Sequence, residues 1–391
     1  MTDLGVSLQL DSIVREASDR ADGLTKLGPG PFIEPLQLAL DSLESEAGLN
    51  VIGRMIARER MIGHTTNRLN YVNDRDRFPG IAREHIVKPV FIIGMPRTGT
   101  TILHDILAQD PSNRAPLTWE AMFPSPPPEA ATFTTDPRIA ACAATFPSVD
   151  LQIPAFKAMH PMGAELTQEC VTMMGESMCT PLFHNQFRVP TYEDWVDDVA
   201  DWSDVYSFHH QQLQHLQWHN HRDRWVLKTG AHLWDLDSLL VQYPDARIVF
   251  THRDPVKSMT SYASLTALVR SMGCDTVDPE EVANDWTARL CKVVTRGLHV
   301  RQSRPYPDAI FYDMFFSDFI LDQFASVTKI YEAFDIPMSD GAARRMQDFI
   351  VDNPPGKHGI HRYAPHEFGV VPARVRAEFR QYIDYFDLPP E

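Results

Sequence analysis

The amino-acid sequence predicts an α/β fold, in which a central parallel sheet lies between two layers of helices and follows a helical N-terminal segment. Two observations predict this class. From about residue 86 to residue 391, short apolar runs of strand character alternate with segments of helical periodicity, the pattern of a parallel sheet covered on both faces. Residues 1–85 show helical periodicity only. We therefore predict a helical segment over residues 1–85 and one α/β domain over residues 86–391.

The helices and strands are predicted as follows. In the N-terminal segment, apolar residues recur at helical spacing over residues 11–21, 34–48 and 50–75. Four later runs have strand character: PVFIIG (89–94), RWVLK (224–228), ARIVFTH (246–252) and AIFYD (309–313). Helical patterns follow Gly99, occupy the region around 192–220, and begin again at residues 232, 255, 279, 317 and 372. The proline-rich stretch 123–137 is predicted to be a surface loop or lid.

Composition excludes several classes of function. The chain has 36 basic and 52 acidic residues, a formal net charge of −16, so it lacks the basic footprint of a general nucleic-acid binder. Its five cysteines are scattered and form no CxxC pair, which favours reduced thiols in a cytoplasmic protein over disulfides or a zinc site. No stretch approaches the ~18 apolar residues of a membrane span. The first residues do not have the pattern of a secretory signal.

The run VFIIGMPRTGTTILHDIL resembles a phosphate-binding loop between a strand and a helix. Its spacing, Gly94-x4-Gly99-Thr100-Thr101, is that of a P-loop, but Thr100 stands where such a loop keeps its lysine. Backbone N–H groups and the helix N-terminus still favour an anion, and Arg97 adds a planar fork of donors. The sequence thus predicts a P-loop-like domain that holds a terminal anion without a metal ion. A glycine turn without a ligand is the alternative.

A second strand end has a similar pattern. After the strand that finishes at Thr251, Arg253 stands where a P-loop protein has its magnesium-binding acid, and Asp254 with Pro255 is typical of a helix start. Ser261 lies two helical turns further on, so it faces the same side as the start of the helix. A lone arginine after a strand is more often a surface ion pair. With the first loop, a second phosphate of the same ligand is the better interpretation.

These two elements resemble the sulfotransferases that use 3′-phosphoadenosine 5′-phosphosulfate (PAPS), and most closely a bacterial, mycobacterial-type branch. The family's PKSGTT loop stands here as PRTGTT, Pro96 to Thr101, and its arginine with a serine eight residues later is matched by Arg253 and Ser261. The resemblance runs from about residue 88 to residue 365. It implies that PAPS is the co-substrate, with no metal. In the cytosolic enzymes a tryptophan that stacks on adenine follows the loop, whereas here the position is Ile102.

The resemblance also implies the residues that bind the donor. A basic–basic–glycine turn that closes over the nucleotide has a looser match in NPPGKHGIHRY. The implied contacts are Arg97, Thr98, Gly99, Thr100, Thr101, Arg253, Ser261, Lys357, His358 and Gly359.

Sulfuryl transfer needs a base for the acceptor's proton and cations for the leaving phosphate. The cytosolic family has KTH after a strand, and this chain has Lys228 and, after a two-residue insertion, His232. We hypothesise that His232 is the base, since imidazole titrates near neutral pH, that Lys228 is a cation near the sulfuryl group, and that Arg97 neutralises the bridging oxygen. A histidine that merely packs is the alternative. Glu169 is the second candidate base, predicted to share a helical face with Glu165.

The histidine-rich tract at residues 209–221 lacks a third metal ligand at recognisable spacing and is interpreted as a polar helix surface. The predicted function is transfer of the sulfuryl group of PAPS to a hydroxyl, phenol or amine of a small-molecule acceptor. The acceptor is expected between the N-terminal helices, the proline-rich loop and the 160–220 region. A P-loop nucleotide or metabolite kinase and a catalytically silent nucleotide-binding module are the alternatives. The sequence leaves the oligomeric state open, a homo-oligomer included.

Overall fold

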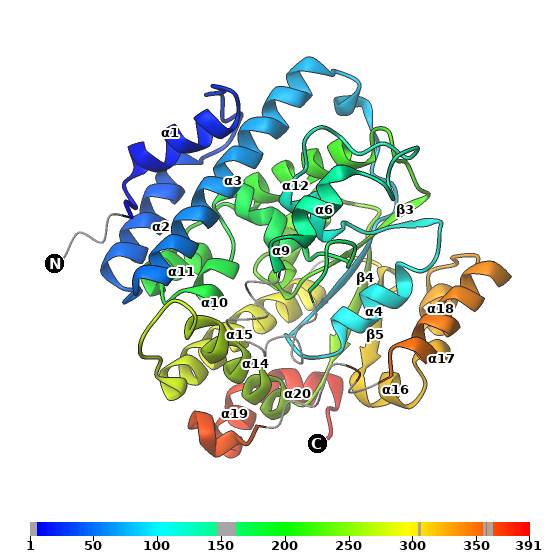
Figure 1. Cartoon of the computed structure of the whole chain (residues 1–391). Coiled ribbons are helices and arrows are strands. Elements are labelled where there is room, and N and C mark those ends of the chain that lie inside the picture. The colour runs from blue at the N-terminus through cyan, green and yellow to red at the C-terminus, as the bar shows by residue number, and fades with distance from the viewer. Residues whose placement is uncertain (1–5, 147–161, 304–305, 355–356, 358–362) are drawn as a thin grey trace.

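The computed structural model describes residues 6–146, 162–303, 306–354, 357 and 363–391 (Figure 1). Within them a five-stranded sheet, all parallel, has the order β2-β3-β1-β4-β5, which confirms the predicted α/β class. The strands are β1 (Val90–Gly94), β2 (Asn113–Arg114), β3 (Arg224–Lys228), β4 (Arg247–His252) and β5 (Phe311–Phe315). The four predicted strands are thus present, β5 two residues later than predicted. The two-residue strand β2 is polar and was not predicted.

Alternate residues of the central strand explain the three layers. Phe91 and Ile93 of β1 belong to one buried apolar cluster, and Val90 and Ile92 belong to another, because successive side chains of a strand point to opposite faces. On the second face lie α4 (Thr100–Leu107), α17 (Gln323–Ala333) and α18 (Asp340–Asp352). The first face is covered by α12 (Trp202–Gln217), α13 (Leu236–Gln242), α14 (Pro255–Arg270) and α15 (Pro279–Ser303).

The N-terminal segment is helical, as predicted. It consists of α1 (Leu10–Arg20), α2 (Ile33–Ser45) and α3 (Val51–Arg77). Leu36 of α2 and Met61 of α3 are fully buried in the same apolar cluster as Phe91 of the central strand. The N-terminal helices are therefore packed onto the first face of the sheet through a continuous core.

Shorter helices complete the chain. They are α5 (Thr118–Met122), α6 (Pro137–Ala143), α9 (Cys170–Met173), α10 (Leu182–Gln186), α11 (Pro190–Asp198), α16 (Phe316–Leu321), α19 (Pro372–Glu378) and α20 (Arg380–Phe386). The proline-rich stretch is irregular up to Pro137, as predicted, but Arg138 donates to the Phe123 carbonyl at 3.0 Å and so ties it down. In the described part of the chain, every helix is too short or too polar to cross a bilayer.

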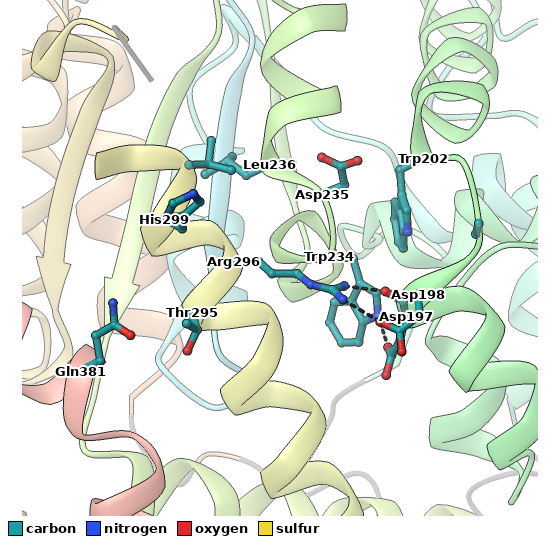
Figure 2. Close-up of a pocket in the computed structure, with 12 residues that line it drawn as sticks. Asp197, Asp198, Trp202, Trp234, Asp235, Leu236, Thr295, Arg296, His299 and Gln381 are labelled. Atoms are coloured by element: carbon teal, nitrogen blue, oxygen red, sulfur yellow. Dashed lines mark hydrogen bonds and ion pairs between the residues drawn. The ribbon is translucent and has the colours of Figure 1, made fainter. Parts of the chain in front are cut away.

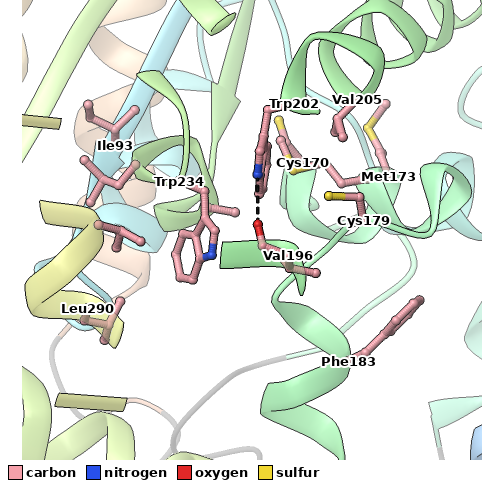
Figure 3. Close-up of a cluster of buried hydrophobic side chains, with 14 of the residues drawn as sticks. Ile93, Cys170, Met173, Cys179, Phe183, Val196, Trp202, Val205, Trp234 and Leu290 are labelled. Carbon is pink, nitrogen blue, oxygen red and sulfur yellow. Dashed lines mark hydrogen bonds between the residues drawn. The ribbon is translucent and has the colours of Figure 1, made fainter. Parts of the chain in front are cut away.

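The core beside α9 is rich in sulfur and aromatic side chains. Cys170, Met173 and Cys179 gather beside Trp202 of α12 in Figure 3, Phe183 of α10 belongs to the same apolar cluster, and all five are buried. The described cysteines form no disulfide, and burial raises the pKa of the Cys170 thiol to about 12. These thiols therefore serve as packing groups.

Candidate active site

The first predicted anion site, called below the first anion site, is the loop Gly94–Thr101, which joins β1 to α4. Three of its residues have positive φ: Gly94 at 146°, Arg97 at 69° and Gly99 at 88°. A Cβ atom on Gly94 would lie 2.2 Å from Oγ1 of Thr251 on the neighbouring strand, so only glycine fits there. A left-handed arginine is unusual and is a feature of functional loops. The loop delivers the chain to the N-terminus of α4, where an anion is favoured.

Thr98 holds this loop in place. Its hydroxyl donates to the Met95 carbonyl at 2.7 Å and lies 2.6 Å from Oγ1 of Thr251, and the whole residue is buried. The side chain thus fastens the loop to β4, and only its backbone is left for the donor contact that the family resemblance implies. Thr100 and Thr101 differ, since both begin α4 and are half-buried.

The second anion site, Arg253 and Ser261, lies directly against the first. Arg97 donates from Nε to Oγ of Ser261 at 3.1 Å, and Arg253 donates from Nη1 to the Arg97 carbonyl at 3.0 Å. Ser261 is only 2% exposed. Burial lowers the pKa of Arg97, and the charge of Arg253 acts in the same direction. A bound anion would oppose both effects.

Phe316, which the sequence reasoning missed, lies beside both anion sites. The Arg253 guanidinium carbon is 4.0 Å from the centre of the Phe316 ring. A Cβ atom on Gly99 would lie 3.1 Å from the same ring. An aromatic residue after the fourth predicted strand was the available signal, but Phe315 and Phe316 could not be told apart. Ile102, at the position of the family's tryptophan, packs instead against the cluster under α4.

Lys228 and Glu169 form an ion pair beside the first anion site. Lys228 ends β3, is 2% exposed, and donates from Nζ to Oγ1 of Thr101 at 3.1 Å. Its ammonium also contacts Oε1 of Glu169, whose side chain is 25% exposed. The Lys228 ammonium therefore contacts both the partly exposed carboxylate of Glu169 and the hydroxyl of Thr101.

The prediction that Glu165 and Glu169 share a helical face is wrong. The helix α9 begins only at Cys170, and Glu169 precedes it in extended conformation. The residues before it pair with a neighbouring segment, since Gln168 donates its N–H to the Pro116 carbonyl at 2.8 Å. Glu169 thus follows a paired extended segment and contacts Lys228. Glu165 is exposed.

His232 lies in the core and is closed off from solvent. It belongs to the 3-10 turn Gly230–Leu233 and has 0% exposure. Nδ1 lies 3.1 Å from the hydroxyl of Tyr206, and Nε2 has no hydrogen-bond partner among the described residues. Burial, with a smaller contribution from His209, lowers its pKa well below the usual value. A base must meet the acceptor's proton, so this position speaks against the role predicted for His232.

Of the remaining predicted contacts, Lys357 lies near the C-terminal end of α18. Lys357 is exposed and donates from Nζ to Oδ1 of Asn353 at 3.0 Å. His358 and Gly359 lie outside the described residues. The basic–basic–glycine turn therefore stays a prediction.

The histidine-rich tract is only partly exposed, since His219 and His221 lie at the surface but two histidines of its helical part are buried. His209 and His215 of α12 are each 1% exposed, with contacts to the Tyr243 hydroxyl at 2.8 Å and to the Pro124 carbonyl at 2.9 Å. Burial lowers the pKa of His209 to about 3 and that of His215 to about 4. The part of the chain that the structure describes holds no group of three or more side chains placed for a metal.

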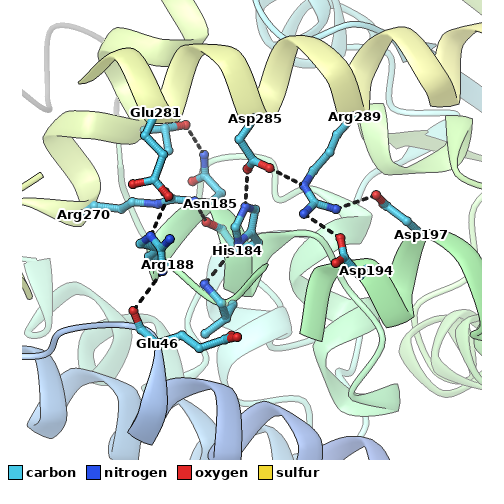
Figure 4. Close-up of polar contacts among 12 residues, drawn as sticks. Glu46, His184, Asn185, Arg188, Asp194, Asp197, Arg270, Glu281, Asp285 and Arg289 are labelled. Carbon is cyan, nitrogen blue, oxygen red and sulfur yellow. Dashed lines mark hydrogen bonds and ion pairs between the residues drawn. The ribbon is translucent and has the colours of Figure 1, made fainter. Parts of the chain in front are cut away.

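An ionic network joins α10, α11 and α15. In Figure 4, Arg289 of α15 donates to Asp285 at 2.9 Å and to Asp197 of α11 at 2.6 Å, and Asp285 lies 2.5 Å from Nε2 of His184. Glu193 of α11 is fully buried, yet neither carboxylate oxygen has a partner among the described residues. Burial and the charge of Asp197 raise its pKa well above the usual value.

A cavity of about 660 Å³ lies between α12, α13, α15 and α20 (Figure 2). Trp202 and Trp234 form part of its wall, and Arg296 crosses it to Asp198, with 2.7 Å between donor and acceptor. None of its lining residues belongs to either anion site or to the Lys228–Glu169 pair. The cavity is therefore separate from the candidate site.

Comparisons with known proteins show the family of the chain. Residues 89–340 match the model of the sulfotransferase family. The chain is similar to the omega-hydroxy-beta-dihydromenaquinone-9 sulfotransferase Stf3 of Mycobacterium tuberculosis, with 23% identity over 303 residues, 72% of either protein. The structure of sulfotransferase STF9 from Mycobacterium avium superposes with a TM-score of 0.90, 26% identity and full coverage of both chains. For STF1 from M. tuberculosis H37Rv the TM-score is 0.85 and the identity 28%, over 96% of this chain and 99% of that one. The chain belongs to the sulfotransferase family.

Proposed function

We propose that this enzyme transfers the sulfuryl group of PAPS to a hydroxyl, phenol or amine of a small-molecule acceptor. The observation that carries the proposal is the junction of the two anion sites, where Arg97 contacts both Ser261 and Arg253. The 5′-phosphosulfate and the 3′-phosphate of PAPS are carried by one ribose. A ligand with two neighbouring anionic groups therefore suits two adjoining anion sites.

The donor would lie across both sites. The 5′-phosphosulfate would bind at the first anion site, at the start of α4, and the 3′-phosphate at the second. Phe316 lies against both Arg253 and Gly99, so its ring is the candidate support for adenine. Arginine and lysine side chains supply the positive charge that magnesium supplies in a P-loop kinase.

Glu169 is the better candidate for the base. Its carboxylate is accessible and lies beside Lys228, whereas His232 is enclosed. In the step we propose, Glu169 takes the proton of the acceptor as the acceptor oxygen or nitrogen bonds to sulfur. The bond between sulfur and the 5′-phosphate oxygen breaks, and Lys228 and Arg97 stabilise the charge that develops on that phosphate.

The acceptor is proposed by class. The name of Stf3 places a hydroxy group on its acceptor, which makes alcohols the first class to test here. Phenols and amines follow. Entry of the acceptor between the N-terminal helices, the proline-rich loop and the 160–220 region stays a prediction.

Two measurements test the proposal. Thermal unfolding with adenosine 3′,5′-bisphosphate (PAP), the desulfated product, should show stabilisation without magnesium. Stabilisation by Mg-ATP alone would favour a kinase, which Thr100 and Arg253 at the Walker lysine and acid positions already disfavour. Transfer from labelled PAPS to an acceptor panel then separates an active enzyme from a silent nucleotide-binding module.

A further inference from the structure

The C-terminal residue Glu391 reaches the second anion site. Its Oε2 atom lies 3.0 Å from Nε of Arg253, with the two side chains 28% and 17% exposed. Arg253 is the residue to which the proposed function assigns the 3′-phosphate. A carboxylate of the chain itself is thus bound to the guanidinium that would hold this phosphate.

Several features hold Glu391 in this position. Leu388 is only 6% exposed and donates its N–H to the Ile383 carbonyl of α20 at 3.1 Å. Two prolines follow, each with a fixed φ. The N–H of Glu391 then donates to Oδ2 of Asp254 at 3.0 Å. The contact is therefore anchored through both the backbone and the side chain.

Asp254 connects this anchor to the helix that carries Ser261. Its Oδ1 atom accepts from the N–H of Val256 at 3.0 Å and caps α14, and its Oδ2 atom also accepts from Arg376 at 2.6 Å. Asp254 is 2% exposed. Glu391 is thus bound to the structural start of α14 and not to a mobile surface group.

A carboxylate and a phosphate compete for a guanidinium. Both accept hydrogen bonds from its N–H fork, and Arg253 already gives Nη1 to the Arg97 carbonyl and Nε to Glu391. If a phosphate bound to Arg253 while Glu391 stayed in place, the two anions would lie close together and repel one another. We infer that Glu391 takes the place of the 3′-phosphate on Arg253 and is displaced when a 3′-phosphorylated nucleotide binds. This inference rests on the proposed function.

The consequence is an energetic cost that only nucleotides with a 3′-phosphate bear. A nucleotide with a 3′-phosphate brings a group that replaces the Glu391 carboxylate, whereas a nucleotide without one leaves the Arg253–Glu391 pair intact. Glu391 therefore weakens the binding of PAPS and PAP but not that of adenosine 5′-monophosphate (AMP).

The test compares the wild type, Glu391→Gln and Asp384→Asn by isothermal titration with PAP and with AMP. Asp384 is an exposed acid of α20 that no contact joins to Arg253 among the described residues. Since an exposed ion pair is worth little, Glu391→Gln should lower the dissociation constant of PAP by up to about fivefold. The dissociation constant of AMP should not change, and Asp384→Asn should match the wild type with both ligands.

Hydrogen exchange gives an independent readout. PAP should accelerate exchange of the Glu391 amide in the wild type, because its bond to Asp254 is released, and AMP should not. Equal PAP affinity in wild type and Glu391→Gln, or an equal gain for AMP, overturns the inference and leaves the proposed function standing. Absence of PAP binding to every variant overturns the proposed function and the inference with it.

Discussion

The two halves of the candidate site are built in different ways. The nucleotide half, made of the first and second anion sites, follows the carboxyl ends of β1 and β4, which are adjacent parallel strands with Gly94 opposite Thr251. The proposed acceptor half, for which Glu169, Lys228 and His232 were the predicted residues, combines an extended segment, a strand end and a buried turn. A short motif therefore fixes the position of its residues in the first half. In the second half, contacts between distant parts of the chain determine which polar residue is exposed and which is buried.

The largest expected effect tests this difference in the acceptor half. Glu169→Gln removes the proposed base but keeps a hydrogen-bonding group next to Lys228. We expect kcat to fall by about 10²–10⁴, with the PAP dissociation constant nearly unchanged. His232→Asn, the matched control, should keep kcat in the same order of magnitude. Steady-state kinetics with PAPS and an identified acceptor measure both values of kcat. A large loss in His232→Asn with little loss in Glu169→Gln would restore His232 as the base.

The second effect tests the nucleotide half. Arg253→Gln removes a charged donor of the proposed 3′-phosphate contact, so the dissociation constant of PAP should rise about 10- to 100-fold. That of AMP should stay the same, because AMP lacks this phosphate. Arg376→Gln is the control, since it removes a nearby cation that contacts Asp254. A parallel loss for PAP and AMP would show that Arg253 acts on the loop and not on the phosphate.

A smaller effect is expected from the aromatic ring between the two anion sites. Phe316→Leu keeps an apolar side chain against Gly99 but removes a flat surface for a base. Titration should show weaker binding of PAP and AMP alike, by about five- to tenfold. Ile102→Leu serves as control, since Ile102 packs away under α4. Unchanged binding in Phe316→Leu would place adenine elsewhere.

The smallest effect concerns stability near the acceptor half. The pKa of Glu193 is raised by burial, so the folded chain holds its proton more tightly than the unfolded chain. The contribution of Glu193 to the free energy of unfolding should therefore fall as the pH rises above about 4.3, the usual glutamate value. Glu193→Gln has no such proton, so its stability relative to the wild type should increase from about pH 5 to about pH 8.

Urea unfolding at several pH values measures this relative stability. Glu332→Gln, in which an exposed acid of α17 is changed, should show no pH-dependent gain. A Glu193→Gln variant with the pH profile of the wild type would mean that Glu193 is ionised in the folded chain or is paired there.

The sequence predicted the fold and the nucleotide half more completely than the acceptor half. Apolar runs identified β1 and β4. Because these two strands are parallel neighbours, the residues that follow their carboxyl ends lie at the same edge of the sheet. The order of the strands was not readable, and β2, with two polar residues, carries no apolar pattern.

In the acceptor half, residue type and spacing did not predict burial. His232 follows Lys228 as in the family motif, although after a two-residue insertion, and the turn Gly230–Leu233 carries it into the core. The histidines of α12 look polar in sequence but bond to Tyr243 and Pro124 inside the protein. Such partners come from distant parts of the chain, and no local pattern specifies them.

The crystal structure of the complex with PAP, grown without a metal ion, tests the central claim most directly. The claim is that the two anion sites bind one nucleotide bisphosphate. We expect the 5′-phosphate at the start of α4, next to Thr100 and Thr101, and the 3′-phosphate within hydrogen-bond distance of Arg253 and Ser261. A complex in which only one of the two phosphates contacts these residues, or in which PAP lies elsewhere, would contradict the claim.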